Sequence, residues 1–306
     1  MNNFHIYEEV GRGKFSVVYK GRKKKSIDYV AVKSIEKNRR KKVLNEVRIF
    51  HSLKNRHILK FYNWYETRNH LWIIFEYCAG GDLFQLIEQD KKLPEETIKK
   101  FGRDLAQGLY YLHANNIIYA DLKPSNVLMN EYNTLKLCDF GLSKKLTDLV
   151  NKPDKKEEKD EDPSKPKSGT PYYMAPELFA EDGVYSFYSD MWALGCVLYE
   201  MATGKPPFAA TGLKDLIQEI AEKDTPQVEG FSPLFNDLIK RLLEKDPVKR
   251  IYWEHLRKHP FWAKEINQRK IPRQPQFDKY LKEVRDINPE EFHEQQMKNA
   301  YFIPNI

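Results

Sequence analysis

The segments YADLKPSN, at residues 119–126, and LCDFG, at residues 137–141, carry the strongest signal in this sequence. They contain four groups that can act on a phosphate: the carboxylate of Asp121, the ammonium of Lys123, and the side-chain oxygens of Asn126 and Asp139, which suit Mg²⁺. Phosphoryl transfer needs such groups, because its catalysis consists mainly of positioning and charge neutralisation. Each residue alone could lie on an ordinary surface. All four in this order, with apolar segments between them, predict a phosphoryl-transfer site.

A glycine-containing turn, GRGKFSVV at residues 11–18, lies upstream between two strand-like segments. Glycine lets backbone N–H groups approach phosphate oxygens, because no Cβ stands in the way. A dinucleotide-binding loop would lead directly into a helix, whereas a strand-like segment follows here, so we reject that interpretation. Glycine turns between strands are common, so this turn is a weak signal on its own.

The segment VAVK places Lys33 among apolar residues at the end of a strand-like segment. A buried lysine needs an anionic partner, and Glu46 on the next helical segment is the expected one. Glu36 is a less favoured alternative partner. An outward-pointing strand lysine is the ordinary alternative to a functional one.

The chain changes character after about residue 79. Strand-like segments precede that point, at residues 4–11, 16–21, 29–34, 59–64 and 71–77, with one helical segment at residues 41–53. Beyond it, Pro94 suits the first turn of a helix with one apolar face, and Ser189 is expected to cap a helix that Gly204 ends. That helix is apolar nearly all round, which predicts a place at the centre of a helical lobe.

Two segments fall outside this pattern. Residues 151–167, NKPDKKEEKDEDPSKPK, are almost entirely charged residues and proline and cannot bury a core, which predicts a flexible insertion at about 147–168. Residues 263–306 are polar and contain scattered prolines, and we expect a tail outside the domain. The domain itself is expected over residues 1–262.

Composition narrows the class of protein further. The 306 residues are 41% hydrophobic and carry a net charge of +7. Basic runs at residues 22–25 and 37–42 lack interleaved aromatic residues, so no nucleic-acid partner is inferred. The three cysteines lie far apart, which is typical of reduced thiols rather than of disulfides or a zinc site. Neither a signal peptide nor a membrane span is recognisable, so we expect a soluble, cytoplasmic protein.

With the segment GTPYYMAPE at residues 169–177, these motifs make the chain resemble a eukaryotic protein kinase from about Tyr7 to Trp262. The resemblance implies an α+β, bilobal fold, with a mainly β lobe at about 1–77 and a mainly α lobe at about 78–262. It also implies ATP and Mg²⁺ as cofactors and transfer of phosphate to proteins. Lys123 together with Thr170 is the serine/threonine-kinase pattern, and Arg250 is expected to pair with Glu177.

The resemblance assigns a role to each matching residue. Lys33 would hold the α- and β-phosphates with Glu46 orienting it, Asp121 would be the catalytic base, and Lys123 would approach the γ-phosphate. Asn126 and Asp139 would bind Mg²⁺. The implied nucleotide contacts are Gly11, Arg12, Gly13, Lys14 and Phe15 in the glycine turn, Val18, Ala31 and Leu128 around adenine, the backbone of Glu76, Tyr77 and Cys78, and Asp82 near the ribose, with Phe75 at the gatekeeper position.

Within the family, the segments at residues 3–21, 69–72 and 204–208 resemble Unc-51-like kinases, nearest their divergent fourth member and the Fused kinases. This implies roles in autophagy or in cilia and the cytoskeleton, protein substrates, regulatory or scaffold partners, and a monomeric domain. Because that fourth member is known as a pseudokinase, a nucleotide-binding scaffold is the main alternative function. A small-molecule kinase on the same fold is a third, which the peptide-docking segment at residues 169–177 disfavours.

The chain departs from the family pattern at Ala120, where an arginine normally anchors a phosphorylated activation loop. We therefore expect activity that does not depend on loop phosphorylation, although Thr147, Ser164 and Ser168 are candidate modification sites. Ser125 occupies a position that is acidic in kinases preferring upstream arginine, so no strong preference of that kind is expected.

Overall fold

The computed structural model describes residues 3–13, 15–146, 170–180 and 183–262. Lys14, the expected insertion with its three candidate modification sites, and the expected tail at residues 263–306 lie outside the described residues. The chain divides into two compact units, the first made of Met1–Leu86 with Pro124–Ser143 and the second of Ile87–Lys123 with Lys144–Ile306.

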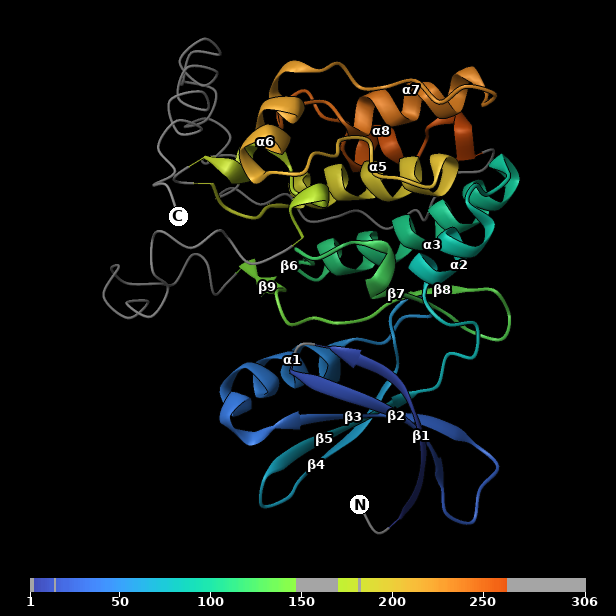
Figure 1. Ribbon diagram of the computed structural model, residues 1–306, viewed down its shortest axis with the longest axis vertical. Helices are drawn as coiled ribbons and strands as arrows, with labels where there is room; N and C mark the ends of the chain where they lie inside the picture. Colours follow the sequence, from blue (N-terminus) through green and yellow to red (C-terminus); the bar gives the residue numbers. More distant parts are fainter. Residues whose placement is uncertain (1–2, 14, 147–169, 181–182, 263–306) are drawn as a thin grey trace. The chain divides into compact units, whose positions relative to one another are not determined.

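A five-stranded antiparallel sheet of order β1-β2-β3-β5-β4 forms most of the first unit (Figure 1). Its strands are β1 (Phe4–Gly13), β2 (Ser16–Lys23), β3 (Tyr29–Glu36), β4 (Phe61–Glu66) and β5 (His70–Glu76). All five were expected from the sequence, with ends that differ by one or two residues. One face of the sheet buries Val30, Val32 and Ile74 beneath half-buried aromatic side chains of its own strands.

Helix α1 (Arg40–Ser52) covers part of the opposite face of the sheet. It follows β3 through the single 3₁₀ turn η1 (Lys37–Arg39), so no free loop separates strand from helix. Its buried residues Val43, Val47 and Phe50 recur at helical spacing, as expected from the sequence. The ring of Phe50 lies 4.9 Å from that of Phe75 and 4.5 Å from that of Phe140, which joins α1 to the core of the unit.

The first unit also contains a segment that returns from later in the chain. The turn η2 (Pro124–Asn126) leads into a hairpin of β7 (Val127–Met129) and β8 (Leu135–Leu137). Reciprocal 2.9 Å hydrogen bonds join the backbone of Met129 to that of Gly80 and Gly81, and the N–H of Leu59 donates to the carbonyl of Leu137 at 2.9 Å. These bonds are why Pro124–Ser143 groups with the strands, although the sequence placed this segment in the helical lobe.

The second unit is mainly helical (Figure 1). Its elements are α3 (Glu95–Ala114), α5 (Phe187–Thr203), α6 (Leu213–Glu222), α7 (Pro233–Leu242), α8 (Trp253–Leu256), the paired strands β6 (Ile117–Ile118) and β9 (Lys144–Lys145), and the turns η3 (Pro171–Tyr173), η4 (Pro176–Phe179) and η5 (Pro260–Trp262), while α2 (Leu83–Asp90) crosses the division between the units. The expected apolar face of α3 is buried, and α5 is buried over nearly its whole length, as its composition predicted.

The predicted starts of two helices were wrong by one to three residues. Ser186, not Ser189, is the N-cap of α5, because the Ser186 hydroxyl accepts from Ser189 N–H while the Ser189 hydroxyl accepts from Ser186 N–H. Pro94 is the N-cap of α3 rather than part of its first turn. The predicted end of α5 is confirmed, since Gly204 adopts φ 79° at its C-cap.

Two expectations from composition have structural counterparts. All three cysteines are free thiols. Within the described ranges, no helix is long and apolar enough to cross a membrane.

Candidate active site

The first unit pairs Lys33 on β3 with Glu46 on α1. Lys33 Nζ lies 3.0 Å from Glu46 Oε1, and the two side chains are only 16% and 6% exposed. Because β3 passes into α1 through one 3₁₀ turn, the short interval between these residues is long enough for the contact. The alternative partner Glu36 is exposed and accepts a hydrogen bond from Asn38 Nδ2 instead.

The charge of Lys33 is stabilised by its surroundings. Burial by itself lowers the pKa of Lys33, but the negative charges of Glu46 and Asp139 outweigh it and raise this pKa above its ordinary value. Lys33 therefore stays protonated at neutral pH. A buried ammonium held in one position is suited to bind polyphosphate oxygens.

Asn126 and Asp139 are brought together by backbone contacts within the first unit. The backbone N–H of Cys138 donates to the carbonyl of Asn126 at 3.0 Å, and the Cys138 thiol donates to the same oxygen at 3.2 Å. Asp139 adopts φ 56°, and its Oδ1 accepts from Gly141 N–H at 3.1 Å. Asn126 and Asp139 thus lie on adjacent segments, which fits a cation that takes few protein ligands.

No cluster of three or more His, Cys, Asp or Glu side chains suited to a metal occurs in the described part of the chain. Magnesium needs fewer protein ligands, because it keeps several waters and is held by one or two carboxylates together with substrate phosphates. The oxygens of Asn126 and Asp139 fit that requirement.

The residues expected around adenine occupy neighbouring strand positions in the first unit. Val18 on β2 pairs with Gly11 on β1 and with Lys33 on β3. Ala31 pairs with Phe75, the expected gatekeeper, and Leu128 forms a bridge with Asp82. Val18 and Ala31 therefore lie on paired strands beside Lys33, and Leu128 lies beside Asp82, whereas Lys14 lies outside the described residues.

The segment expected to bond the adenine edge is held by a contact that the sequence analysis missed. Lys136 Nζ on β8 lies 2.9 Å from Glu76 Oε1, and the backbone N–H of Lys60 donates to the same oxygen at 2.6 Å. The Glu76 side chain is thus used to fix the end of β5.

Two other expected contact residues near this segment have their own surroundings. Asp82 accepts at 2.8 Å from Gln85 N–H at the start of α2. Burial raises the pKa of the Cys78 thiol to about 12.

Asp121, Lys123 and Thr170 come together in the second unit. Lys123 Nζ lies 3.1 Å from Asp121 Oδ1 and 3.1 Å from Thr170 Oγ1. Their joint contact links the loop after β6 to the residue before η3. Lys123 is thereby positioned by an anion on one side and a hydroxyl on the other.

A buried polar network supports the backbone just before Asp121. Asp190 on α5 accepts from the N–H groups of Tyr119 and Ala120, both at 2.9 Å, and lies 2.8 Å from His113 Nε2. Trp253 Nε1 can only donate, and it donates to His113 Nδ1 at 2.9 Å, so Nε2 carries the proton that His113 shares with Asp190. These roles were not predicted from the sequence, where the one signal was an acidic residue inside an apolar helix.

This network holds a strained backbone. Ala120 adopts φ 66°, in the left-handed region that residues with a Cβ rarely occupy. Its N–H bond to Asp190 fixes that conformation. Strain of this kind persists only where surrounding contacts determine it, and here it sets the direction in which the chain reaches Asp121.

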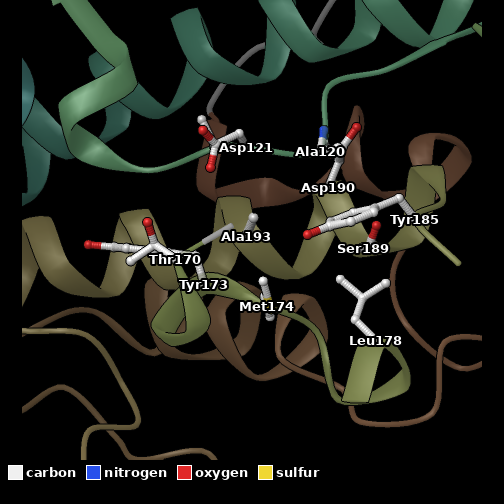
Figure 2. A pocket seen from close by; sticks show the side chains of 11 residues that line it. Ala120, Asp121, Thr170, Tyr173, Met174, Leu178, Tyr185, Ser189, Asp190 and Ala193 are labelled. Carbon is white, nitrogen blue, oxygen red and sulfur yellow. Dashed lines mark hydrogen bonds between the residues drawn. The ribbon is translucent and has the colours of Figure 1, made fainter. Parts of the chain in front are cut away.

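A small cavity lies beside Asp121, Thr170 and Tyr185 in the second unit (Figure 2). Its volume of about 20 Å³ is enough for a single water. Ala120 lines it with only a methyl group. Burial, followed by the charges of Asp121 and Asp190, raises the pKa of Tyr185 to about 12, so this phenol stays protonated at neutral pH.

Glu177 and Arg250 form the expected ion pair in the second unit. Arg250 Nη1 and Nη2 donate to the two carboxylate oxygens at 2.8 and 2.9 Å. Arg250 also donates to the carbonyls of Tyr188 and Glu244, both at 2.8 Å. One arginine therefore joins η4, the start of α5 and the segment after α7.

Each of these two sets, one around Lys33 and one around Asp121, contains residues of the protein kinase motifs found in the sequence. The chain belongs to the protein kinase domain family, which matches it over residues 4–262. It is similar to the serine/threonine-protein kinase RUNKEL of Arabidopsis thaliana, with 54% identity over 91% of this chain and 20% of that protein. It is also similar to serine/threonine-protein kinase ULK4 of Mus musculus, with 40% identity over 86% of this chain and 22% of that protein. Serine/threonine-protein kinase fused of Drosophila melanogaster is 35% identical over 85% of this chain and 31% of that protein.

The expected bilobal α+β kinase fold and the resemblance to serine/threonine kinases of the Unc-51-like and Fused branch are therefore confirmed. Family membership implies the use of ATP and, typically, of Mg²⁺. The chain spans only about a fifth to a third of the length of the three relatives named above.

Proposed function

We propose that this chain transfers the γ-phosphoryl group of ATP to serine or threonine hydroxyl groups of other proteins. The observation that carries the proposal is the contact of Lys123 with both Asp121 and Thr170, at 3.1 Å each. An isolated carboxylate or lysine could serve many purposes. A carboxylate, an ammonium and a threonine in mutual contact, in a chain that also retains the buried Lys33–Glu46 pair, suit transfer to a hydroxyl group.

The first-unit residues would bind the donor nucleotide. Lys33 would hold the α- and β-phosphates, in the orientation that its bond to Glu46 provides. Asn126 and Asp139 would hold Mg²⁺, which when bound neutralises phosphate charge. The side chains of Val18, Ala31 and Leu128 would contact the adenine.

The second-unit residues would act on the acceptor. Asp121 would accept the proton of the substrate hydroxyl, and Lys123 would stabilise charge on the transferred group. The bond from Lys123 to Thr170 would couple this step to the segment that begins η3.

The test is phosphate transfer from labelled ATP to a generic basic protein, for the parent chain and its Asp121→Asn variant, with and without Mg²⁺. We expect Mg²⁺-dependent transfer that falls by about 10²–10⁴-fold in the variant. ATP binding, measured as the thermal stabilisation that ATP produces, should be the same in the parent chain and the variant. Transfer that survives the substitution would remove Asp121 from the mechanism.

The alternative of a scaffold without phosphotransfer is not favoured by these features. Lys33, Asp121, Asn126 and Asp139 are all present, and the relatives compared above are named as kinases. If no transfer occurred in any condition while ATP still stabilised the protein, the scaffold function would replace our proposal.

We further propose a kinase domain over residues 1–262 that acts as a monomer on protein substrates without strong preference for upstream arginine. A cytoplasmic location is supported by the three free thiols, because free cysteines are typical of reducing compartments. Peptide profiling, size-exclusion chromatography and imaging of a tagged chain test these points in turn.

A further inference from the structure

The tip of the glycine turn is in contact with the start of helix α1. Phe15, in the turn between β1 and β2, is 46% exposed. The guanidinium carbon of Arg39 lies 3.2 Å from the centre of the Phe15 ring. At this distance the planar guanidinium rests on the ring face, which is the favourable geometry for a cation–π contact.

Arg39 projects from a turn that is itself held in place. The turn η1 joins β3 to α1 directly, and two residues, one at the start of the turn and one just after it, are fastened to β4. Lys37 Nζ lies 2.6 Å from Glu66 Oε1, and Arg40 Nε lies 3.4 Å from Glu66 Oε2. The hydrogen bond from Lys37, more than that from Arg40, lowers the pKa of Glu66, so this anchor stays charged near neutral pH.

The same helix also carries Glu46, the partner of Lys33. We infer that Arg39 is a positioning residue. Through its contact with Phe15 it holds the glycine turn in a fixed position relative to α1, and therefore relative to Lys33. This inference rests on the proposed function only in that the turn binds the phosphates of ATP. A turn held in its binding conformation loses less conformational entropy when nucleotide binds, and so binds it more tightly.

The primary test compares Arg39→Ala with Lys41→Ala, which removes one positive charge from an exposed residue two positions away and leaves Phe15 and the contacts of Glu66 untouched. We expect Arg39→Ala to raise the KM for ATP and the Kd for a non-hydrolysable ATP analogue by about 3- to 30-fold, the range of a cation–π contact. The kcat should change by less than about twofold, because Arg39 does not touch the reacting groups. Lys41→Ala should leave KM and Kd within about twofold of the parent.

The Arg39→Lys variant distinguishes the effect of stacking on the Phe15 ring from the effect of the positive charge. Lysine keeps the positive charge but lacks the planar group that lies on the ring, so we expect it to recover only part of the lost affinity. Full recovery would mean that long-range attraction of ATP is the cause, and it would overturn the inference. So would equal effects of Arg39→Ala and Lys41→Ala.

A second measurement does not depend on nucleotide or on phosphotransfer. Hydrogen–deuterium exchange of the nucleotide-free protein should be faster at the glycine turn in Arg39→Ala and in Phe15→Leu. The double variant should be no faster than either single one, because both remove one contact. Unchanged exchange in Arg39→Ala, or additive effects in the double variant, would contradict the inference even if phosphotransfer were confirmed. Both side chains are partly exposed, so folding should survive their replacement.

Discussion

Arg250 donates one hydrogen bond to each carboxylate oxygen of Glu177, at 2.8 and 2.9 Å, with the arginine side chain fully buried and the glutamate 7% exposed. Taking two such charges out of water is costly, and their mutual attraction offsets the cost only while both are present. The pair therefore contributes little net stability, but the protein loses stability sharply when one member of the pair is removed.

Replacing Arg250 with methionine should lower the free energy of unfolding by about 3–5 kcal/mol, because Glu177 is left as an unpaired buried charge. Urea denaturation at neutral pH measures this. Arg241→Met is the matched control, since its pair with Asp237 has side chains 56% and 43% exposed. That variant should lose less than about 1 kcal/mol. Comparable losses in the two variants would show that breaking the buried pair costs no more stability than breaking an exposed pair.

Asp190→Asn should impair catalysis without touching the reacting groups. Asp190 accepts from two backbone N–H groups and contacts His113, whereas the amide of asparagine has only one accepting oxygen. At least one buried donor is then left unpaired, at about 1–3 kcal/mol of stability. The displaced backbone before Asp121 should lower kcat by about 10- to 100-fold, with a smaller change in KM. A kcat equal to that of the parent would refute this positioning role.

Glu46→Gln should lower kcat/KM by about 10- to 100-fold, in line with the loss of supporting partners at other catalytic sites. The variant removes the negative charge that holds Lys33, at an unchanged side-chain size. Glu36→Gln is the control, because Glu36 was the alternative partner from the sequence and is exposed in the structure. Steady-state kinetics should show no effect of Glu36→Gln, and an effect at Glu36 equal to that at Glu46 would reverse the assignment.

Thiol-reactive reagents should modify the folded protein very slowly. Burial raises the pKa of Cys78 to about 12 and also raises the pKa of Cys138 and of Cys196. Since only the thiolate reacts, a higher pKa means less reactive species at a given pH. At pH 8 a thiol with this pKa reacts about a thousandfold more slowly than a free cysteine. Mass spectrometry of iodoacetamide-treated protein should find Cys78 unlabelled when folded and labelled in urea, and rapid native labelling would contradict the buried state.

The site was predicted from the sequence wherever its chemistry depends on residues close together in the chain. Asp121 and Lys123 share one loop, so order and residue type were enough to assign roles to them. The buried face of α3 and the burial of α5 followed from helical periodicity, because the apolar spacing itself encodes the face. Helix starts were less certain, since Ser186 and Ser189 are chemically equivalent and only the backbone conformation distinguishes N-cap from N3.

Contacts between distant residues were decided by the tertiary structure alone. His113 and Asp190 are 77 residues apart, and nothing in either local sequence specifies their bond. The same holds for Lys136 with Glu76 and for Arg39 with Phe15, because spacing along the chain carries no information on which strand or turn will lie opposite. The amino-acid sequence by itself determined the kinase fold and the candidate reacting groups, through local motifs and periodicity. Folding determined how those groups are held, because the supports are polar contacts between segments that meet only when the core has formed.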